Sequence, residues 1–175
     1  MAMDGRLQLR SDVVAFLEIP DSGEQTAKKY VRMQGFTSFS VSKNPKEYSR
    51  QYVDESQEQT DVTGYSPSID FAFDKYVGNE VHDYIAEIID NEVIGTAAVV
   101  NIVLVDTTKE ETQTGEPNAS SRPYSVIANT EGGSMDAYTY EGTFAVKGNR
   151  TWGQAVVAEN GLTLTNFTNT INETV

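Results

Sequence analysis

The sequence has no cysteine and a single histidine, and these two shortages exclude most reactive centres. Without cysteine, the 175-residue chain can form no disulfide, no thiolate metal site and no cysteine nucleophile. The one histidine, His82, has no nucleophile motif around it, and it lies at the border of an apolar helical stripe where a packing or surface role is the simpler interpretation. We therefore expect no enzyme activity, no cofactor and no bound metal.

Basic residues are also scarce, since 13 Lys and Arg stand against 26 Asp and Glu, a net charge of −13. A protein that grips nucleic acid needs an excess of Lys and Arg to neutralise phosphates, so the balance disfavours this class. The charge has two interpretations, general solubility and a surface that repels nucleic acid.

Long apolar runs are missing as well. The longest, near residues 96–105, contains Asn101 and is too short to span a bilayer. Residues 1–10 lack the apolar stretch of a secretory signal. We expect a soluble protein that is made inside the cell.

The chain is rich in strand patterns. Residues 13–19, 31–41, 48–52, 69–73 and 138–146 show alternation, and residues 99–105 are nearly continuously apolar, which is typical of a strand buried on both faces. Gly142 falls on the apolar side of its strand and marks a bulge or a close backbone approach. The pairs Gly148-Asn149 and Asn160-Gly161 favour tight turns and predict a three-stranded meander over residues 137–167.

One segment follows a helical period instead. The apolar residues of 79–92 recur at helical spacing: Val81, Tyr84, Ile85, Ile88 and Ile89. Asn79 can cap this helix through its side chain. One helix on a strand-rich core predicts a mainly β fold, a sandwich or barrel with a single α-helix.

We expect one domain over residues 1–175, with four less regular segments. Residues 1–12 form an N-terminal arm, 107–122 a mobile loop and 168–175 a C-terminal tail, while 43–67 is polar and irregular. The stretch 131–134 lacks the spacing of a phosphate-binding loop and is interpreted as a flexible turn.

Two features of composition leave alternatives open. Four acids gather in the polar segment: Asp54, Glu55, Glu58 and Asp61. A glycosidase holds two carboxylates ~5 to 10 Å apart in a cleft, whereas loop acids are usually solvated, so a hydrolase is a minor alternative. The nine tyrosines suit either partly wet contact surfaces or the core and edges of a small β domain.

Four stretches, in order, resemble one known family. They are residues 44–55 (NPKEYSRQYVDE), 60–65 (TDVTGY), 122–127 (RPYSVI) and 136–144 (DAYTYEGTF), with an alternating strand and an acidic amphipathic helix after the second. Together they are similar to the major tail tube proteins of long-tailed bacteriophages that infect Gram-positive bacteria. The resemblance covers roughly residues 31–153.

The resemblance implies two packed antiparallel sheets flanked by one α-helix, with a long inter-strand loop at residues 43–63. It also implies hexameric rings, in which neighbouring sheets join into an inner barrel, and stacking of rings into a tube that conducts DNA to the host. The loop would reach the next ring, so we take its residues as contact candidates: Tyr48, Arg50, Tyr52, Asp54, Glu55, Glu58 and Asp61.

Three acids that alternate with apolar residues are candidates for the lumen: Asp70, Asp74 and Glu141. An acidic lumen would keep DNA from adhering. The implied partners are further copies of the chain, a tape measure protein, a tail terminator and tail tip or baseplate proteins, with no membrane. The implied location is the tail of the virion, assembled in the cytoplasm of the bacterial host. The alternative is an all-β virion decoration or receptor-binding module, which would not polymerise.

Overall fold

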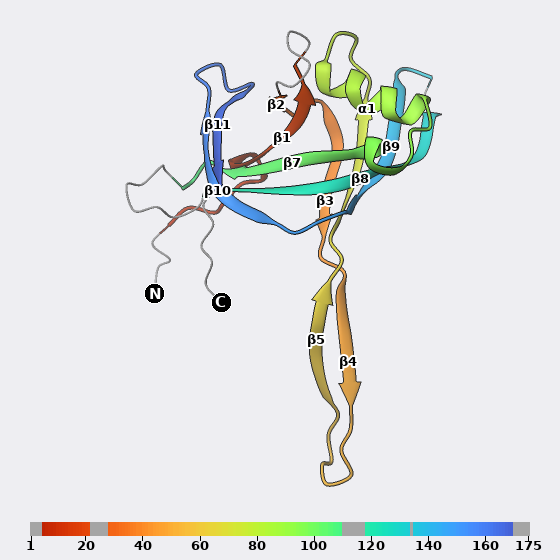
Figure 1. Ribbon diagram of the computed structural model, residues 1–175, viewed down its shortest axis with the longest axis vertical. Helices are drawn as coiled ribbons and strands as arrows, with labels where there is room; N and C mark the ends of the chain where they lie inside the picture. Colours follow the sequence, from red (N-terminus) through yellow and green to blue (C-terminus); the bar gives the residue numbers. More distant parts are fainter. Residues whose placement is uncertain (1–4, 22–27, 110–117, 134, 170–175) are drawn as a thin grey trace.

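The computed structural model in Figure 1 describes residues 5–21, 28–109, 118–133 and 135–169. The strands are β1 (Val13–Pro20), β2 (Lys28–Arg32), β3 (Phe36–Ser42), β4 (Pro45–Arg50), β5 (Gln59–Tyr65), β6 (Ser68–Asp74), β7 (Val99–Asp106), β8 (Ala119–Gly133), β9 (Tyr138–Val146), β10 (Thr151–Val157) and β11 (Leu164–Asn169). The helix is α1 (Glu80–Asp90), and two 3₁₀ turns are η1 (Arg10–Asp12) and η2 (Gly95–Ala98). The prediction of a mainly β fold with one helix is therefore confirmed.

Nine of the strands form one antiparallel sheet in the order β2-β1-β7-β8-β9-β6-β3, with β10 joined to the start of β8 and β11 joined to β10. The strand β8 is the longest, at 15 residues, and it belongs to both halves of this sheet. It pairs with β7 over Ala119–Ser125 and with β9 over Tyr124–Gly133. The sheet curls around this shared strand, as Figure 1 shows, so its two ends form two packed layers.

Two clusters of buried side chains lie on opposite faces of β1 and β7. On one face, Leu17 and Ile102 pack with the helix and with the aromatic residues of β6 and β9. On the other face, Phe16 and Val103 pack against the β10–β11 pair. The period of two along β1 sends successive residues to different clusters, which is why this strand is apolar on both sides.

The helix α1 lies where the apolar spacing predicts it. The Asn79 side chain accepts hydrogen bonds from the backbone N–H groups of Val81 and His82, at 3.1 and 3.2 Å, and so caps the first turn. The stripe that contains Ile85 and Ile89 is buried against the sheet. Asp83 and the other acids of the helix are exposed.

The polar segment 43–67, expected to be irregular, is a β-hairpin of strands β4 and β5, and that prediction was wrong. The two strands pair over six positions, from Pro45 with Tyr65 to Arg50 with Gln59, and form a second, two-stranded sheet. Figure 1 shows this hairpin extending far from the rest of the molecule. Because neither face packs on a core, both faces are mostly polar, and alternation is visible only over the short strand predicted at residues 48–52, of which 48–50 lie in β4.

The long strand β8 replaces two expected irregular segments. Residues 119–122 of the expected loop 107–122 lie in β8, as do residues 131–133 of the expected turn. The end of β8 pairs residue by residue with β9, from Glu131 with Tyr140 to Gly133 with Tyr138. Residues 110–117, 134 and 170–175 lie outside the described residues, while Thr168 and Asn169 of the expected C-terminal tail belong to β11.

The expected meander is half right. Strands β10 and β11 pair as an antiparallel hairpin, but β10 does not follow β9 in the sheet and pairs with β8 at Thr151–Gly153 instead. The connection is held across β8 by the Lys147 N–H, which donates to the Pro123 carbonyl at 3.0 Å. The turn at Gly148 therefore connects β9 to β10, which both pair with β8, and it does not form a β-hairpin.

Gly142 sits where the backbone comes close to its neighbours, as its place on the apolar side predicts. A Cβ at this position would collide with the Ile127 carbonyl oxygen and would lie 2.7 Å from the Phe71 ring. Opposite Gly142 the β8–β9 register shifts between Ala128 and Thr130, which is a β-bulge.

Candidate assembly surfaces

The β4–β5 hairpin carries all seven residues predicted to make inter-ring contacts. Tyr48, Arg50 and Asp61 lie on one face of the ribbon, since Tyr48 is opposite Asp61 and Arg50 follows two residues after Tyr48. The remaining four lie at or near the tip: Tyr52, Asp54, Glu55 and Glu58. Every one of the seven is exposed.

Polar contacts within the hairpin hold its two strands together. The Ser49 and Thr60 hydroxyls are 2.8 Å apart across the strands, and Arg50 donates to the Tyr48 hydroxyl at 3.0 Å. At the tip, the Gln59 side chain donates to the Glu55 carboxylate at 2.5 Å. A two-stranded ribbon is marginal by itself in water, so a partner surface would add to its stability.

The hairpin leaves the body through a fixed joint. Asn44 adopts the left-handed conformation, with φ of 44°, and its side chain donates to the Ser66 carbonyl and the Ser68 hydroxyl. The Ser66 N–H donates back to the Asn44 carbonyl at 3.1 Å. Asparagine tolerates this backbone region better than most residues, so Asn44 suits the point where the strands leave the sheet.

The three predicted lumen acids lie on one face of the sheet. Asp70 and Asp74 share that face of β6, and Glu141 of β9 is directly opposite Ala72 between them. The Thr143 hydroxyl donates to Asp70 at 2.9 Å, and the Thr130 hydroxyl donates to Glu141 at 3.1 Å. The other face of the same strands carries the buried aromatic residues, so the acids point away from the core.

This acidic face contains no basic residue. Strands β3, β6 and β9 and residues 125–133 of β8 have no Lys, Arg or His, and their polar residues are mostly Ser, Thr, Asp and Glu. The face also has two open edges. Among the described strands, β3 pairs only with β6, and residues 127–133 of β8 pair only with β9. Open edges of this kind can pair with another chain.

The single histidine has a structural role. His82 is fully buried between Phe36 and Phe73, and its ring stacks on the Phe73 ring at 4.4 Å. Its Nδ1 accepts the Tyr76 N–H at 3.1 Å, so the neutral ring carries its proton on Nε2 and donates to the Gln34 carbonyl at 2.7 Å. Burial lowers the pKa of His82, which favours the neutral form.

A hollow at the edge of the described sheet offers little for acid–base chemistry. It measures about 940 Å³ and lies between the start of β1 and the open edge of β3. Arg10 and Arg32 are its only charged residues, and its lining contains no acid and no histidine.

Within the described residues no group of three or more His, Asp or Glu is placed to hold a metal ion. No helix of the described chain has the length and apolar character needed to cross a membrane.

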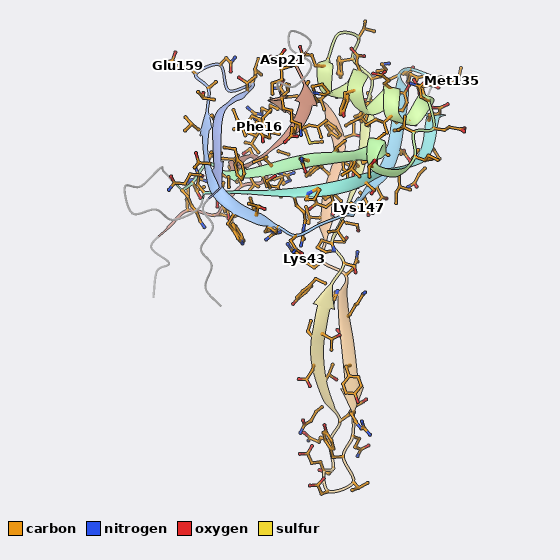
Figure 2. All side chains as sticks on the ribbon, viewed as in Figure 1. Phe16, Asp21, Lys43, Met135, Lys147 and Glu159 are labelled. Atoms are coloured by element: carbon orange, nitrogen blue, oxygen red, sulfur yellow. The ribbon has the colours of Figure 1, made fainter. Side chains whose placement is uncertain are left out.

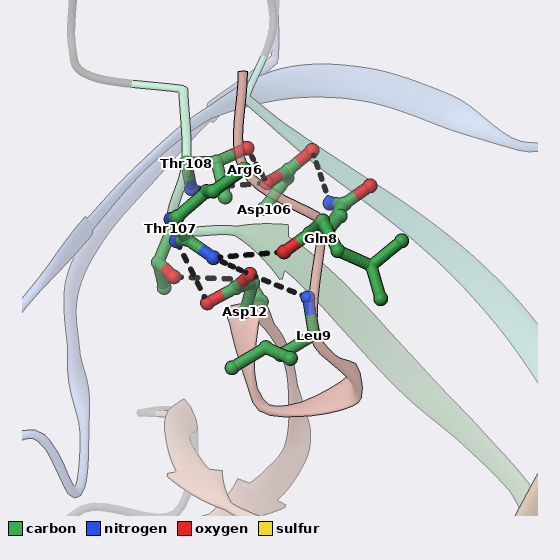
Figure 3. Close-up of polar contacts among 8 residues, drawn as sticks. Arg6, Gln8, Leu9, Asp12, Asp106, Thr107 and Thr108 are labelled. Atoms are coloured by element: carbon green, nitrogen blue, oxygen red, sulfur yellow. Dashed lines mark hydrogen bonds and ion pairs between the residues drawn. The ribbon is translucent and has the colours of Figure 1, made fainter. Parts of the chain in front are cut away.

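The part of the predicted N-terminal arm that is described lies against its own subunit (Figure 3). Arg6 forms a two-pronged ion pair with Asp12, at 2.7 and 3.1 Å, and Gln8 donates to Asp106 at 3.2 Å. The Arg6 contact, followed by the Leu9 N–H, lowers the pKa of Asp12. Residues 6–12 are therefore fastened to the end of β7 rather than extended away from the body.

Comparison with solved structures finds a similar fold in two other chains. A chain in the tail of an empty gene transfer agent particle, refined with C6 symmetry, superposes with a TM-score of 0.57 at 12% identity, covering 83% of this chain and 98% of that one. A chain in the virion of the native gene transfer agent particle gives 0.55 at 13% identity, with the same coverage. The chain has the fold of a phage-like tail protein.

A chain of the anti-feeding prophage baseplate also matches, with a TM-score of 0.42 at 10% identity, covering 81% of this chain and 91% of that one. No protein-family model matches the sequence, and no curated protein matches it. The likeness to the two gene transfer agent chains therefore lies in the fold, since only 12 and 13% of the residues are identical.

Proposed function

We propose that this protein is a structural subunit of a phage-like tail, whose copies join into hexameric rings that stack into a tube for DNA. The observation that carries the proposal is the acidic face of β8, β9, β6 and β3, which has an open edge on each side. A face with two open edges is incomplete in a single copy and becomes complete when copies join.

Ring closure follows from the direction of the strands. The four strands alternate in direction from β8 to β3, so β3 runs opposite to β8. A neighbouring copy in the same orientation would place its β8 antiparallel to β3 and continue the alternation. A head-to-tail contact that closes gives a cyclic oligomer, and the C6 symmetry of the similar tail supports six copies.

The acidic face would then line the inside of the ring. Asp70, Asp74 and Glu141 would meet the passing DNA, and no Lys or Arg on these strands would hold its phosphates. DNA would pass without specific binding. Under this assignment, part of the net charge of −13 repels the phosphates of the passing DNA in addition to keeping the protein soluble.

The hairpin would make the contact between rings. Tyr48 and Tyr52 are about half exposed, at 48% and 49%, and Val62 is at 52%, so the ribbon presents apolar surface that a neighbour could cover. Its other contact candidates are polar: Arg50, Asp54, Glu55, Glu58 and Asp61. In this proposal the further partners are a tape measure protein, a tail terminator and tail tip or baseplate proteins. The protein acts in the virion tail after assembly in the bacterial cytoplasm, and it is not an enzyme.

Negative-stain electron microscopy of the concentrated protein tests the proposal, with light scattering to give the mass. We expect rings or tubes, and a smallest closed species of six 19.3-kDa copies. A protein that stays monomeric at about 1 mM would overturn the proposal, because open edges at that concentration should pair. A monomer would instead favour an all-β binding module.

A further inference from the structure

Four basic residues gather where the hairpin leaves the body. Lys43 follows the end of β3, Arg122 lies in β8, and Lys147 and Arg150 lie between β9 and β10. The Arg122 Nε donates to the Gly148 carbonyl at 3.0 Å, which ties two of these segments together. Figure 2 shows Lys43 and Lys147 near the root of the hairpin. We call these four residues the base cluster.

The base cluster has no ion-pair partner within the described residues. The ion pairs within the described residues involve Arg6, Lys28, Lys29 and Lys75, and none includes a member of the base cluster. Burial, and then the positive charges of Arg150 and Arg122, lower the pKa of Lys43. Nine of the 13 basic residues form no ion pair within the described residues, and the base cluster differs from the others because its four members lie together.

The far end of the hairpin has the opposite charge. Residues 51–61 contain four carboxylates and no Lys, Arg or His. We call these four residues the tip cluster: Asp54, Glu55, Glu58 and Asp61. All four are exposed, and none forms an ion pair within the described part of the chain.

The length of the hairpin sets the distance between the base cluster and the tip cluster. Asp54 is 11 residues beyond Lys43, and an extended strand rises ~3.4 Å per residue, so the hairpin is about 35 to 40 Å long. A second copy displaced by that distance along the hairpin has its base cluster level with the tip cluster of the first. The same displacement repeats without closing, so it generates a filament in which every copy gives one tip and receives one.

We propose that the base cluster is the receiving site for the tip cluster of a second copy of this chain. The inference rests on the proposed stacking of rings and names the surface that the hairpin meets. Opposite charges at the two ends would guide the approach and fix the register between rings. The contact should therefore weaken as salt rises.

Cations could also attract the phosphates of nucleic acid, and the observations favour carboxylates instead. The protein as a whole has a net charge of −13, which repels DNA, whereas a second copy brings four carboxylates on a hairpin of matching length. Binding of DNA to the base cluster is kept as an outcome of the test.

Reversing two of the four charges at each end provides the experiment, and it takes the base cluster from +4 to 0 and the tip cluster from −4 to 0. The base-reversed variant is Lys43→Glu with Lys147→Glu, and the tip-reversed variant is Asp54→Lys with Glu58→Lys. These four side chains are exposed, and Arg122 and Arg150, which contact the body, are left unchanged. The combined variant has the wild-type net charge of −13. Lys109→Glu, a change at another exposed lysine, is the matched control for Lys43→Glu alone.

Tube length is measured by negative-stain electron microscopy at about 0.15 M salt, where surface charges still act over ~8 Å. We expect wild type and Lys109→Glu to form tubes, and each reversed variant to give rings without long tubes. The combined variant should recover tubes, because its new lysines at the tip can pair with the new glutamates at the base of the next copy. A mixture of the two reversed variants should also form tubes, because the unchanged tip cluster of one variant meets the unchanged base cluster of the other, and the new lysines meet the new glutamates.

The outcomes separate the two proposals. Failure of the wild type to form rings or tubes would refute the proposed function. Wild-type tubes with unshortened base-reversed tubes would refute the receiving site alone, as would failure of both the combined variant and the mixture to recover length. Fluorescence anisotropy with a labelled DNA duplex completes the set. Binding that is lost in the base-reversed variant, with its tubes intact, would make the base cluster a nucleic-acid site and overturn the inference.

Discussion

The body of the molecule and its hairpin differ in how much of their side-chain surface is buried. The body buries large apolar residues completely, among them Phe16, Phe73 and Phe144, each with 0% exposure. The hairpin buries none of the residues of β4 and β5. Strand pairing alone therefore does not require a core within the same copy, and the hairpin has the composition of a segment whose packing partners come from elsewhere.

Aromatic stacking shows how much the body depends on its own contacts. Phe71 stacks on Phe144 at 4.2 Å, and Phe73 stacks on His82 at 4.4 Å and on Tyr140 at 5.4 Å. The Tyr140 hydroxyl donates to Asp90 at the end of the helix, at 3.0 Å. Substitutions in the body should therefore change the stability of one subunit, whereas substitutions in the hairpin should change assembly.

The largest effect is expected from Phe73→Ala. The ring lies at the centre of the stack, so its loss leaves a cavity and should lower the free energy of unfolding by about 3 to 5 kcal/mol. Urea denaturation of the isolated subunit measures this change. Phe39→Ala, at a half-buried ring on the open-edged strand β3, is the control and should cost clearly less. Equal losses for the two variants would show that the stack is not the centre of the core.

Acid should destabilise the body through His82. Its pKa in the folded protein lies below the value of 6.5 for the free side chain, so the unfolded chain binds a proton first as pH falls. The contribution is fully present above about pH 6.5 and is lost as the pH falls toward the folded pKa. The charged groups nearby are Asp74, Lys75 and Asp83.

We expect the free energy of unfolding to fall as the pH drops from about 7.5 through 6.5 toward the folded pKa, by ~1.4 kcal/mol for each unit by which the pKa is lowered. In His82→Gln the stability at pH 7.5 should drop by ~1 to 3 kcal/mol, because the hydrogen bonds to Tyr76 and Gln34 are disturbed. Its dependence on pH in this range should be flatter than that of the wild type. An unchanged slope would mean that other groups cause the acid sensitivity.

A smaller effect is expected at the start of the helix. Asn79→Ala removes the side-chain acceptor for the N–H groups of Val81 and His82 and should cost about 1 kcal/mol. Asn79→Asp keeps the acceptor, so it should stay near the wild-type midpoint in thermal unfolding. If both variants lose the same stability, the cap is not the cause.

The smallest effect on the single subunit is expected in the hairpin. Tyr48→Ser removes a half-exposed ring that packs on no core, so the free energy of unfolding should change by no more than ~0.5 kcal/mol. The same variant should shorten tubes under the proposed function. A loss of subunit stability comparable to that of Phe73→Ala would contradict the division between body and hairpin.

The sequence predicted those elements in which one side is buried. The helix has an apolar stripe and a capping Asn79, and the strand of Ile69, Phe71 and Phe73 alternates strictly. In each element the apolar residues recur with the helical or strand period, because one side of the element is buried. Residues 48–52 gave a short strand signal, but the rest of the hairpin follows no such period, because solvent lies on both of its faces. The position of the segment between two strands and its contact residues came from the family resemblance, and the pairing of β4 with β5 is seen only in the structure.

The arrangement of strands was harder to predict than their positions. The turn at Gly148 suits a tight hairpin locally, yet β10 joins β8 because its apolar side must cover Phe16 and Val103. Long-range burial therefore overrides local turn preference. The base cluster was not predicted either, since its four members are scattered between residues 43 and 150 and meet only after folding.

The long strand β8 has a consequence for how the molecule unfolds. Ala119 at one end belongs to the cluster on one face of the sheet, and Tyr124 and Val126 belong to the cluster on the other face. Neither cluster can lose its packing without freeing part of the same strand. The two clusters should therefore melt in one cooperative transition, and amide hydrogens beside Phe16 and beside Phe144 should exchange with solvent at similar rates.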